Sequence, residues 1–118
     1  LIDYLIELDG KLVYLEIKSA VLREGRYALY PDSPSSRGRR QVRDLIKHVE
    51  GEGRGTVLFI AALPGVEAFR PNKAADPEMY ELLLEAQESG VVLKSIGIHY
   101  NPEDYFVYLY NPDLSVLL

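Results

Sequence analysis

Three charged residues near the start of the chain, Asp3, Glu16 and Lys18, have the types and spacing to bind a divalent cation. They flank Asp9-Gly10, a dipeptide typical of a two-residue β-hairpin turn. Such a turn would place Asp3 directly opposite Glu16, with Lys18 on the same face. Directly opposed side chains have Cβ atoms about 4.5–5.5 Å apart, and like charges there destabilise a hairpin. A divalent cation between the carboxylates would convert this repulsion into attraction.

The chemistry that such a cluster supports is metal-assisted hydrolysis of a phosphodiester. Mg²⁺ prefers octahedral oxygen ligands and is usually held by one or two carboxylates together with water and substrate phosphate. Asp3 and Glu16 would supply the carboxylates, and Lys18 would orient the attacking water or stabilise its hydroxide form. The alternative is a solvated surface hairpin, because Glu-x-Lys is a common pattern on strands.

Composition limits the kinds of protein that this chain can be. With 118 residues, 47% hydrophobic and 26% charged, it is expected to form a single globular domain over 1–118. The absence of cysteine excludes disulfides, thiolate zinc sites and cysteine nucleophiles, and it fits a cytoplasmic protein. No apolar run approaches the ~20 residues of a membrane span, so no membrane partner is expected. Because the chain lacks an initiator Met and enters just before Asp3, we expect a fragment with an upstream segment missing.

Hydrophobic periodicity predicts an α/β fold in which a mixed β-sheet is flanked by helices. Strands are expected over 2–8, 11–19, 26–30, 56–63, 91–100 and 105–110, and helices over 37–50 and 77–89. Ser35 or Ser36 is the expected N-cap of the first helix, and Asp76 and Gly90 are expected to bound the second. The segment between the central strand and the second helix is expected to be a loop.

The predicted hairpin carries apolar residues on both faces. One face is expected to pack on the core, and it consists of Ile2, Tyr4, Ile6, Leu8, Val13, Leu15 and Ile17. The opposite face ends in Asp3, Glu16 and Lys18. Buried carboxylates need partners, so this charged end is expected at a covered edge or cleft.

Four arginines open the first predicted helix: Arg37, Arg39, Arg40 and Arg43. The free amide groups at a helix N-terminus already favour anions, and guanidinium groups bind phosphates well. This end of the helix is therefore a candidate grip for the phosphates of DNA. The alternative is an exposed helix paired with the many carboxylates of the chain, whose net charge is −5. Gln41 is expected to face solvent, with contact to a base or a phosphate as the weaker alternative.

Several separated motifs resemble one protein family. They are Glu16-Ile17-Lys18-Ser19 with Leu22, Tyr30-Pro31-Asp32-Ser33, Ser36-Arg37-Gly38, Phe69-x-Pro71-Asn72 with Asp76-Pro77, and Gly90-Val91. In this order they resemble the C-terminal domain of the sugar fermentation stimulation protein A family. The pattern of Asp3 followed by Glu16-x-Lys18 resembles the signature of the restriction-endonuclease-like, PD-(D/E)XK, nuclease superfamily. The chain departs from the family in the first predicted helix, which reads Arg-Gly-Arg-Arg-Gln over 37–41 where the family tends to have a histidine.

The resemblance implies a nuclease-like core that binds DNA and lacks its upstream OB-like DNA-binding domain here. By analogy with the superfamily, Asp3, Glu16 and the carbonyl of Ile17 would hold Mg²⁺ or Mn²⁺, and Asp3, Glu16 and Lys18 would be catalytic. The chain is thus a candidate Mg-dependent deoxyribonuclease, and the family is linked to regulation of sugar (maltose) use. Two alternatives stay open. One is a DNA-binding regulatory module that does not cut, and the other is a structural domain that forms a homo-oligomer through its C-terminal strands.

Overall fold

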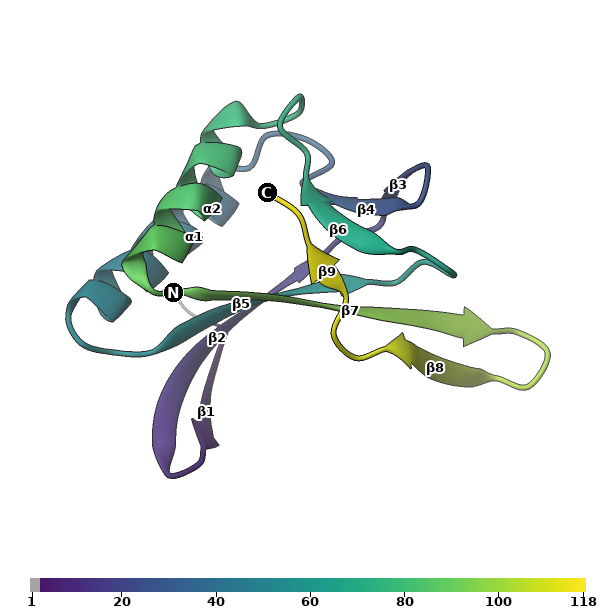
Figure 1. Ribbon diagram of the computed structural model, residues 1–118, viewed down its shortest axis with the longest axis horizontal. Coiled ribbons are helices and arrows are strands. Elements are labelled where there is room, and N and C mark those ends of the chain that lie inside the picture. Colours follow the sequence, from purple (N-terminus) through teal and green to yellow (C-terminus); the bar gives the residue numbers. More distant parts are fainter. Residues whose placement is uncertain (1–2) are drawn as a thin grey trace.

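Two helices pack side by side against the larger of two sheets in the computed structural model, which describes residues 3–118 (Figure 1). The helices are α1 (Ser36–Glu50) and α2 (Pro77–Ser89). The five-stranded sheet has the order β1 (Tyr4–Leu8), β2 (Lys11–Ser19), β5 (Gly55–Ala61), β7 (Val92–Asn101), β8 (Phe106–Asn111). The four-stranded sheet has the order β3 (Leu22–Glu24), β4 (Tyr27–Tyr30), β6 (Ala68–Pro71), β9 (Ser115–Val116). None of the described helices is long and apolar enough to cross a membrane.

Both sheets mix parallel and antiparallel pairing. In the larger one, the central strands β2, β5 and β7 are parallel, and the outer strands β1 and β8 pair antiparallel. This confirms the predicted α/β class with mixed pairing and flanking helices. The prediction of one sheet was wrong, because β3, β6 and β9 had not been recognised as strands. They have only three, four and two residues, too few to show a periodic pattern, and β6 and β9 are held by non-local pairing.

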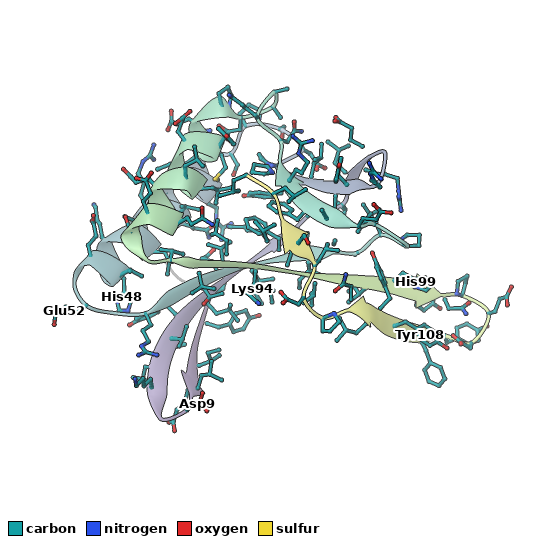
Figure 2. The ribbon with its side chains drawn as sticks, viewed as in Figure 1. Asp9, His48, Glu52, Lys94, His99 and Tyr108 are labelled. Carbon is teal, nitrogen blue, oxygen red and sulfur yellow. The ribbon has the colours of Figure 1, made fainter. Side chains whose placement is uncertain are left out.

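The hairpin turn has the predicted conformation and register. Asp9 and Gly10 both have positive φ, 52° and 76°, as this two-residue turn requires. Tyr4 pairs with Leu15 and Leu8 with Lys11, which is the predicted alignment. Asp9 lies at the tip of this hairpin, while His99 and Tyr108 lie on the β7–β8 hairpin, so both hairpins extend away from the helices (Figure 2).

The hairpin face that had been predicted to meet the core is instead largely exposed. Val13 is buried, but Tyr4 and Leu8 are 56% and 58% exposed, and Ile2 lies outside the described residues. The apolar side chains of this face line an open pocket of about 610 Å³. The other face meets α1 only along β2, where Tyr14 contacts the ring of His48 at a centroid distance of 3.9 Å, and it is exposed at Leu5 and Leu12. The periodicity could not decide between two apolar faces. The side was set by the crossover through α1 that joins the parallel strands β2 and β5, because such crossovers have one hand.

The core lies between the helices and both sheets. Phe59 of the larger sheet stacks on Phe69 of the smaller one, with ring centroids 4.0 Å apart, and both are fully buried. Leu45 of α1 and Leu83 of α2 belong to the same cluster. This packing fixes the start of α1 against the charged end of β2.

Capping side chains set the helix ends as predicted. Ser35 is the N-cap of α1, and its hydroxyl accepts a hydrogen bond from the amide of Gly38. Asp76 caps α2, Pro77 occupies its first turn, and Gly90 ends it in the left-handed conformation with φ 103°. The N-terminus of α1 is therefore positioned accurately beside β2 and β4.

Candidate functional site

Glu16 is a fully buried carboxylate on β2, with 0% exposure. Its Oε1 accepts a hydrogen bond of 2.9 Å from the backbone nitrogen of Asp3. Its Oε2 accepts no hydrogen bond, and it is the one buried side-chain oxygen or nitrogen of the described residues without one. A buried charge is costly unless it is paired or coordinates a metal. Its nearest positive charge is the ammonium group of Lys18, 3.2 Å away.

Asp3 is tied to the same stretch of β2 in a reciprocal way. Its Oδ2 accepts a hydrogen bond of 3.0 Å from the amide of Ile17, while its own amide donates to Glu16. The two carboxylates therefore lie next to each other at the end of the hairpin, as the turn geometry predicts. Among residues 3–118, no group of three or more His, Cys, Asp or Glu side chains is arranged around a common point. A cation here would take its remaining oxygens from backbone carbonyls, water or a ligand.

Lys18 is held in one orientation by two groups. Its Nζ forms the ion pair with Glu16 and also donates a hydrogen bond to Oε1 of Gln41 on α1. The Lys18 side chain is only 11% exposed. The ammonium group is thus fixed between the buried carboxylate and the helix.

Gln41 had been predicted to face solvent, and this was wrong. It is 7% exposed and lies on the inner side of α1, one turn before Leu45. The sequence did contain a signal, because the buried positions 38, 41, 42, 45 and 46 form a single helical stripe. Position 41 belongs to this stripe although glutamine is polar.

A pocket of about 320 Å³ lies where the hairpin, β4 and the start of α1 meet. Asp3, Lys18, Tyr30, Arg37 and Gln41 all line it. Apart from the carboxylate of Asp3, these side chains present hydrogen-bond donors, so the pocket suits a cation and an anion side by side.

Tyr30 reaches this pocket because position 38 is glycine. An added Cβ on Gly38 would lie 2.7 Å from the Tyr30 hydroxyl oxygen and 2.9 Å from Oγ of Ser35. Burial, together with the negative charges of Asp76 and Glu16, raises the pKa of Tyr30 to about 12. The phenol therefore stays protonated at neutral pH and keeps its hydrogen-bond donor.

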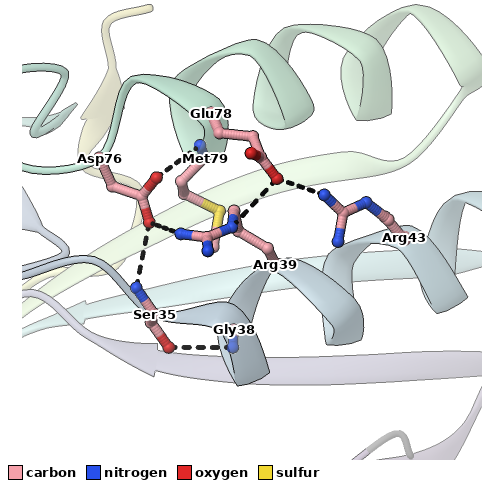
Figure 3. A network of polar contacts seen from close by, with 7 residues as sticks. All are labelled: Ser35, Gly38, Arg39, Arg43, Asp76, Glu78 and Met79. Atoms are coloured by element: carbon pink, nitrogen blue, oxygen red, sulfur yellow. Dashed lines mark hydrogen bonds and ion pairs between the residues drawn. The ribbon is translucent and has the colours of Figure 1, made fainter.

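The four arginines of α1 fall into two pairs. Nη1 of Arg39 lies 2.7 Å from Oδ2 of Asp76, its Nε lies 3.1 Å from Glu78, and Arg43 also pairs with Glu78 (Figure 3). Arg39 and Arg43 thus tie α1 to α2. Arg37 and Arg40, in contrast, are exposed and form no ion pair with another described residue.

Asp76 is the centre of this helix–helix network. Its carboxylate accepts hydrogen bonds of 3.1 Å from the amides of Met79 and Ser35 and binds Arg39 (Figure 3). Burial alone would raise the pKa of Asp76, but these amides and the guanidinium group outweigh it and lower the pKa. One carboxylate therefore caps α2 and also fixes the loop before α1.

Comparison with known proteins identifies the relatives of this chain. Residues 1–104 match the family described as SfsA, sugar fermentation stimulation protein RE domain. A sugar fermentation stimulation protein homolog of Pyrococcus furiosus is 46% identical over 107 residues, which cover 91% of this chain and 46% of that protein. The homolog of Archaeoglobus fulgidus is 43% identical over 105 residues, covering 89% of this chain and 46% of that protein.

A solved structure agrees with the fold. It is described as the structure of Pyrococcus furiosus SfsA in complex with Ca²⁺, and it superposes with a TM-score of 0.95 at 44% identity. The match covers 99% of this chain and 50% of that one, so the chain spans about half the length of the relatives that it matches. The chain belongs to the sugar fermentation stimulation protein family.

Proposed function

We propose that this domain binds a divalent cation through Asp3 and Glu16 and acts on the phosphodiester backbone of DNA, as in the PD-(D/E)XK nucleases. Oε2 of Glu16 carries the proposal: it is buried, it accepts no hydrogen bond, and its charge is balanced only by the ion pair with Lys18 among the described residues. Such a carboxylate oxygen near a second carboxylate is suited to a metal ion. The structure of the P. furiosus relative in complex with Ca²⁺ supports it. Both Ca²⁺ and Mg²⁺ prefer carboxylate, carbonyl and water oxygens.

The residues of the site would divide the work as follows. Asp3, Glu16 and the carbonyl of Ile17 would hold Mg²⁺ or Mn²⁺, and the bound ion would lower the pKa of a water and neutralise charge on the phosphate. Lys18, whose ammonium group is held by Glu16 and Gln41, would orient the attacking water. Tyr30 would donate a hydrogen bond to the same ligand as a neutral phenol.

Contact with DNA is assigned to Arg37 and Arg40 in the first place. Both are exposed, both line a pocket of about 220 Å³, and Arg37 also lines the pocket that contains Asp3. Arg39 and Arg43 can add positive potential, but their guanidinium groups already bind the carboxylates of α2. The net charge of −5 means that phosphate binding must be local to this face.

A DNA-binding regulatory module that does not cut is the second candidate. The observation that favours it is the double engagement of Lys18 by Glu16 and Gln41, which holds the ammonium group within the protein. A role in sugar use rests on the family description and applies to either candidate.

Calorimetric titration with Mn²⁺ and Ca²⁺ tests the metal site. We expect Asp3→Asn to weaken binding at least tenfold, because second-sphere and ligand changes typically cost 10–100-fold in metal affinity. Asp113→Asn is the matched control, since Asp113 is 74% exposed and pairs only with Lys94 at the surface. Equal affinity in the wild type and Asp3→Asn would overturn the metal site.

Incubation with supercoiled plasmid and Mg²⁺ or Mn²⁺ then separates the two candidates. The nuclease proposal expects nicking by the wild type and none by Asp3→Asn. A wild type that binds metal and DNA but leaves the plasmid intact would establish the non-cleaving module instead.

A further inference from the structure

Gln41 is a polar side chain enclosed by the protein beside the candidate site. It is 7% exposed and lies on the inner stripe of α1 among apolar residues. A buried amide must satisfy both its oxygen and its nitrogen, or it destabilises the fold. Only one of these two atoms has a partner among the described residues, namely Oε1, which accepts from Lys18.

The partner of Oε1 determines where the amide nitrogen points. An ammonium group only donates hydrogen bonds, so the oxygen of the amide must be the atom that faces Lys18. Nε2 then lies at the other end of the planar amide group and points away from the ammonium group. Nε2 forms no hydrogen bond with another described residue. Among residues 3–118, Glu16 Oε2 is the one fully buried side-chain nitrogen or oxygen without a hydrogen-bond partner, so Nε2 is not fully buried. The nitrogen therefore retains access to solvent.

The surroundings of Gln41 show what this nitrogen can reach. Gln41 lines the 320 Å³ pocket together with Asp3, Lys18 and Arg37, among others, and the neighbouring 220 Å³ pocket together with Arg37, Arg40 and Asp44. Among the described residues, Gln41 and Arg37 are the two that line both pockets. Nε2 is thus a donor near three cationic side chains, Lys18, Arg37 and Arg40, which outnumber the two carboxylates of these pockets. Such a donor suits a ligand that accepts hydrogen bonds and carries negative charge.

We propose that Gln41 has two functions: Oε1 positions the ammonium group of Lys18, and Nε2 donates a hydrogen bond to a non-bridging phosphate oxygen of DNA. The second function rests on the proposed action on DNA, whereas the first concerns the protein alone. Glutamine suits both functions because one neutral group offers an acceptor and a donor. A glutamate would keep the acceptor but repel phosphate, and a leucine would supply neither.

Two substitutions separate the two functions. Gln41→Glu keeps an acceptor for Lys18 and removes the donor, while Gln41→Leu removes both. Gln87→Leu is the matched control, because Gln87 lies on the exposed side of α2. Gln41→Met, which preserves the length of the side chain, replaces Gln41→Leu if that variant fails to fold.

The first measurement is the hydrogen-exchange rate of the Lys18 ammonium protons by ¹H–¹⁵N NMR, without metal or DNA. We expect exchange at least tenfold faster in Gln41→Leu than in the wild type, and near the wild-type rate in Gln41→Glu and Gln87→Leu. Wild-type exchange in Gln41→Leu would overturn the positioning function.

The second measurement is the affinity for a short DNA duplex in Ca²⁺, by fluorescence anisotropy. We expect Gln41→Glu and Gln41→Leu each to bind about tenfold more weakly, in line with loss of one hydrogen bond to a charged group, and Gln87→Leu to bind as the wild type does. Wild-type affinity in Gln41→Glu, or no DNA binding by the wild type, would overturn the phosphate contact.

Failure of the proposed metal site can be distinguished from these outcomes, because it would appear as equal Ca²⁺ affinity of the wild type and Asp3→Asn. The NMR result would still decide whether Gln41 positions Lys18.

Discussion

At the scale of single residues, the pocket beside the hairpin differs from an ordinary surface depression in the burial, pairing and pKa of the side chains in and next to it. Glu16 is buried with an unsatisfied oxygen, and Lys18 is held in place from two sides. Tyr30 is half-buried at the edge of the pocket, and burial is the main cause of its raised pKa. Groups perturbed in this way cluster at functional sites, although structural networks perturb them as well.

The titration of Tyr30 provides a direct test of this environment. Its pKa is raised from the usual 10.0 to about 12 in the folded protein, so ionisation is disfavoured by folding. The stabilisation is complete below pH 10, and it is lost as the pH rises toward 12. We expect ¹³C NMR of the tyrosine ring carbons to show a resonance that titrates near pH 12 and disappears in Tyr30→Phe.

The tyrosine of the β7–β8 hairpin is the control for this titration. The hydrogen bond to Asp104 raises the pKa of Tyr108 as well, but Tyr108 is exposed and lies outside the pocket. Tyr108→Phe is therefore expected to leave the Tyr30 resonance unchanged. Titration of the Tyr30 resonance near pH 10 would contradict the burial of the Tyr30 hydroxyl group.

At the scale of secondary-structure elements, α1 carries two surfaces with different tasks. Arg39 and Arg43 face α2 and pair with Asp76 and Glu78, which fixes the two helices relative to each other (Figure 3). Arg37 and Arg40 face away from these carboxylates and border the pockets. Adjacent arginines in the sequence therefore have distinct roles, because successive residues of a helix point in different directions.

Substitution of two neighbouring arginines tests this division. Arg39→Ala leaves Asp76, which is 2% exposed, without its guanidinium partner, and we expect a loss of about 2 kcal/mol of unfolding free energy in urea denaturation. Arg40→Ala removes an exposed residue and should change stability by less than about 0.5 kcal/mol.

For DNA binding, we expect Arg40→Ala to have the larger effect and Arg39→Ala the smaller one. Arg40→Ala is expected to weaken affinity and to reduce the salt slope by about one, which a titration at several salt concentrations measures.

The two variants are each other's control. If Arg39→Ala changed the salt slope as much as Arg40→Ala did, the arginines would form one continuous phosphate grip. Equal stability of the two variants would contradict the structural role of Arg39.

At the scale of the whole molecule, the β7–β8 hairpin presents apolar side chains to solvent on both faces. Tyr105, Phe106 and Val107 are 78%, 64% and 62% exposed, and β8 is the outer strand of its sheet. Exposed apolar edge strands are prone to pair with another chain. A homo-oligomer formed through the C-terminal strands therefore remains a prediction, and the exposed edge strand β8 is the surface that would form the contact.

A charge on this surface should prevent self-association. Sedimentation equilibrium is expected to show a concentration-dependent dimer for the wild type and a monomer for Val107→Lys, because an edge lysine blocks strand pairing. Val92→Lys is the control, since Val92 is also exposed, at 50%, but lies outside the part of β7 that pairs with β8, which is Gly97–Asn101. A wild type that stays monomeric at all concentrations would contradict the prediction.

The sequence by itself determined the features that depend on neighbouring residues. Asp9-Gly10 set the hairpin register, and Ser35, Asp76 and Gly90 set the helix ends. These signals are reliable because a turn or a cap is satisfied by residues within a few positions of it. The proximity of Asp3 and Glu16 followed from the same local geometry.

The tertiary structure alone decided which surfaces and partners those elements meet. It placed the charged face of the hairpin under α1, set Gln41 against Lys18, 23 residues away, and paired Arg39 with Asp76, 37 residues away. It also formed β6 and β9, which have no pattern of their own. Contacts between distant segments depend on the hand of the crossover and on how the helices pack. A periodic sequence pattern states that a face is apolar but not what covers it.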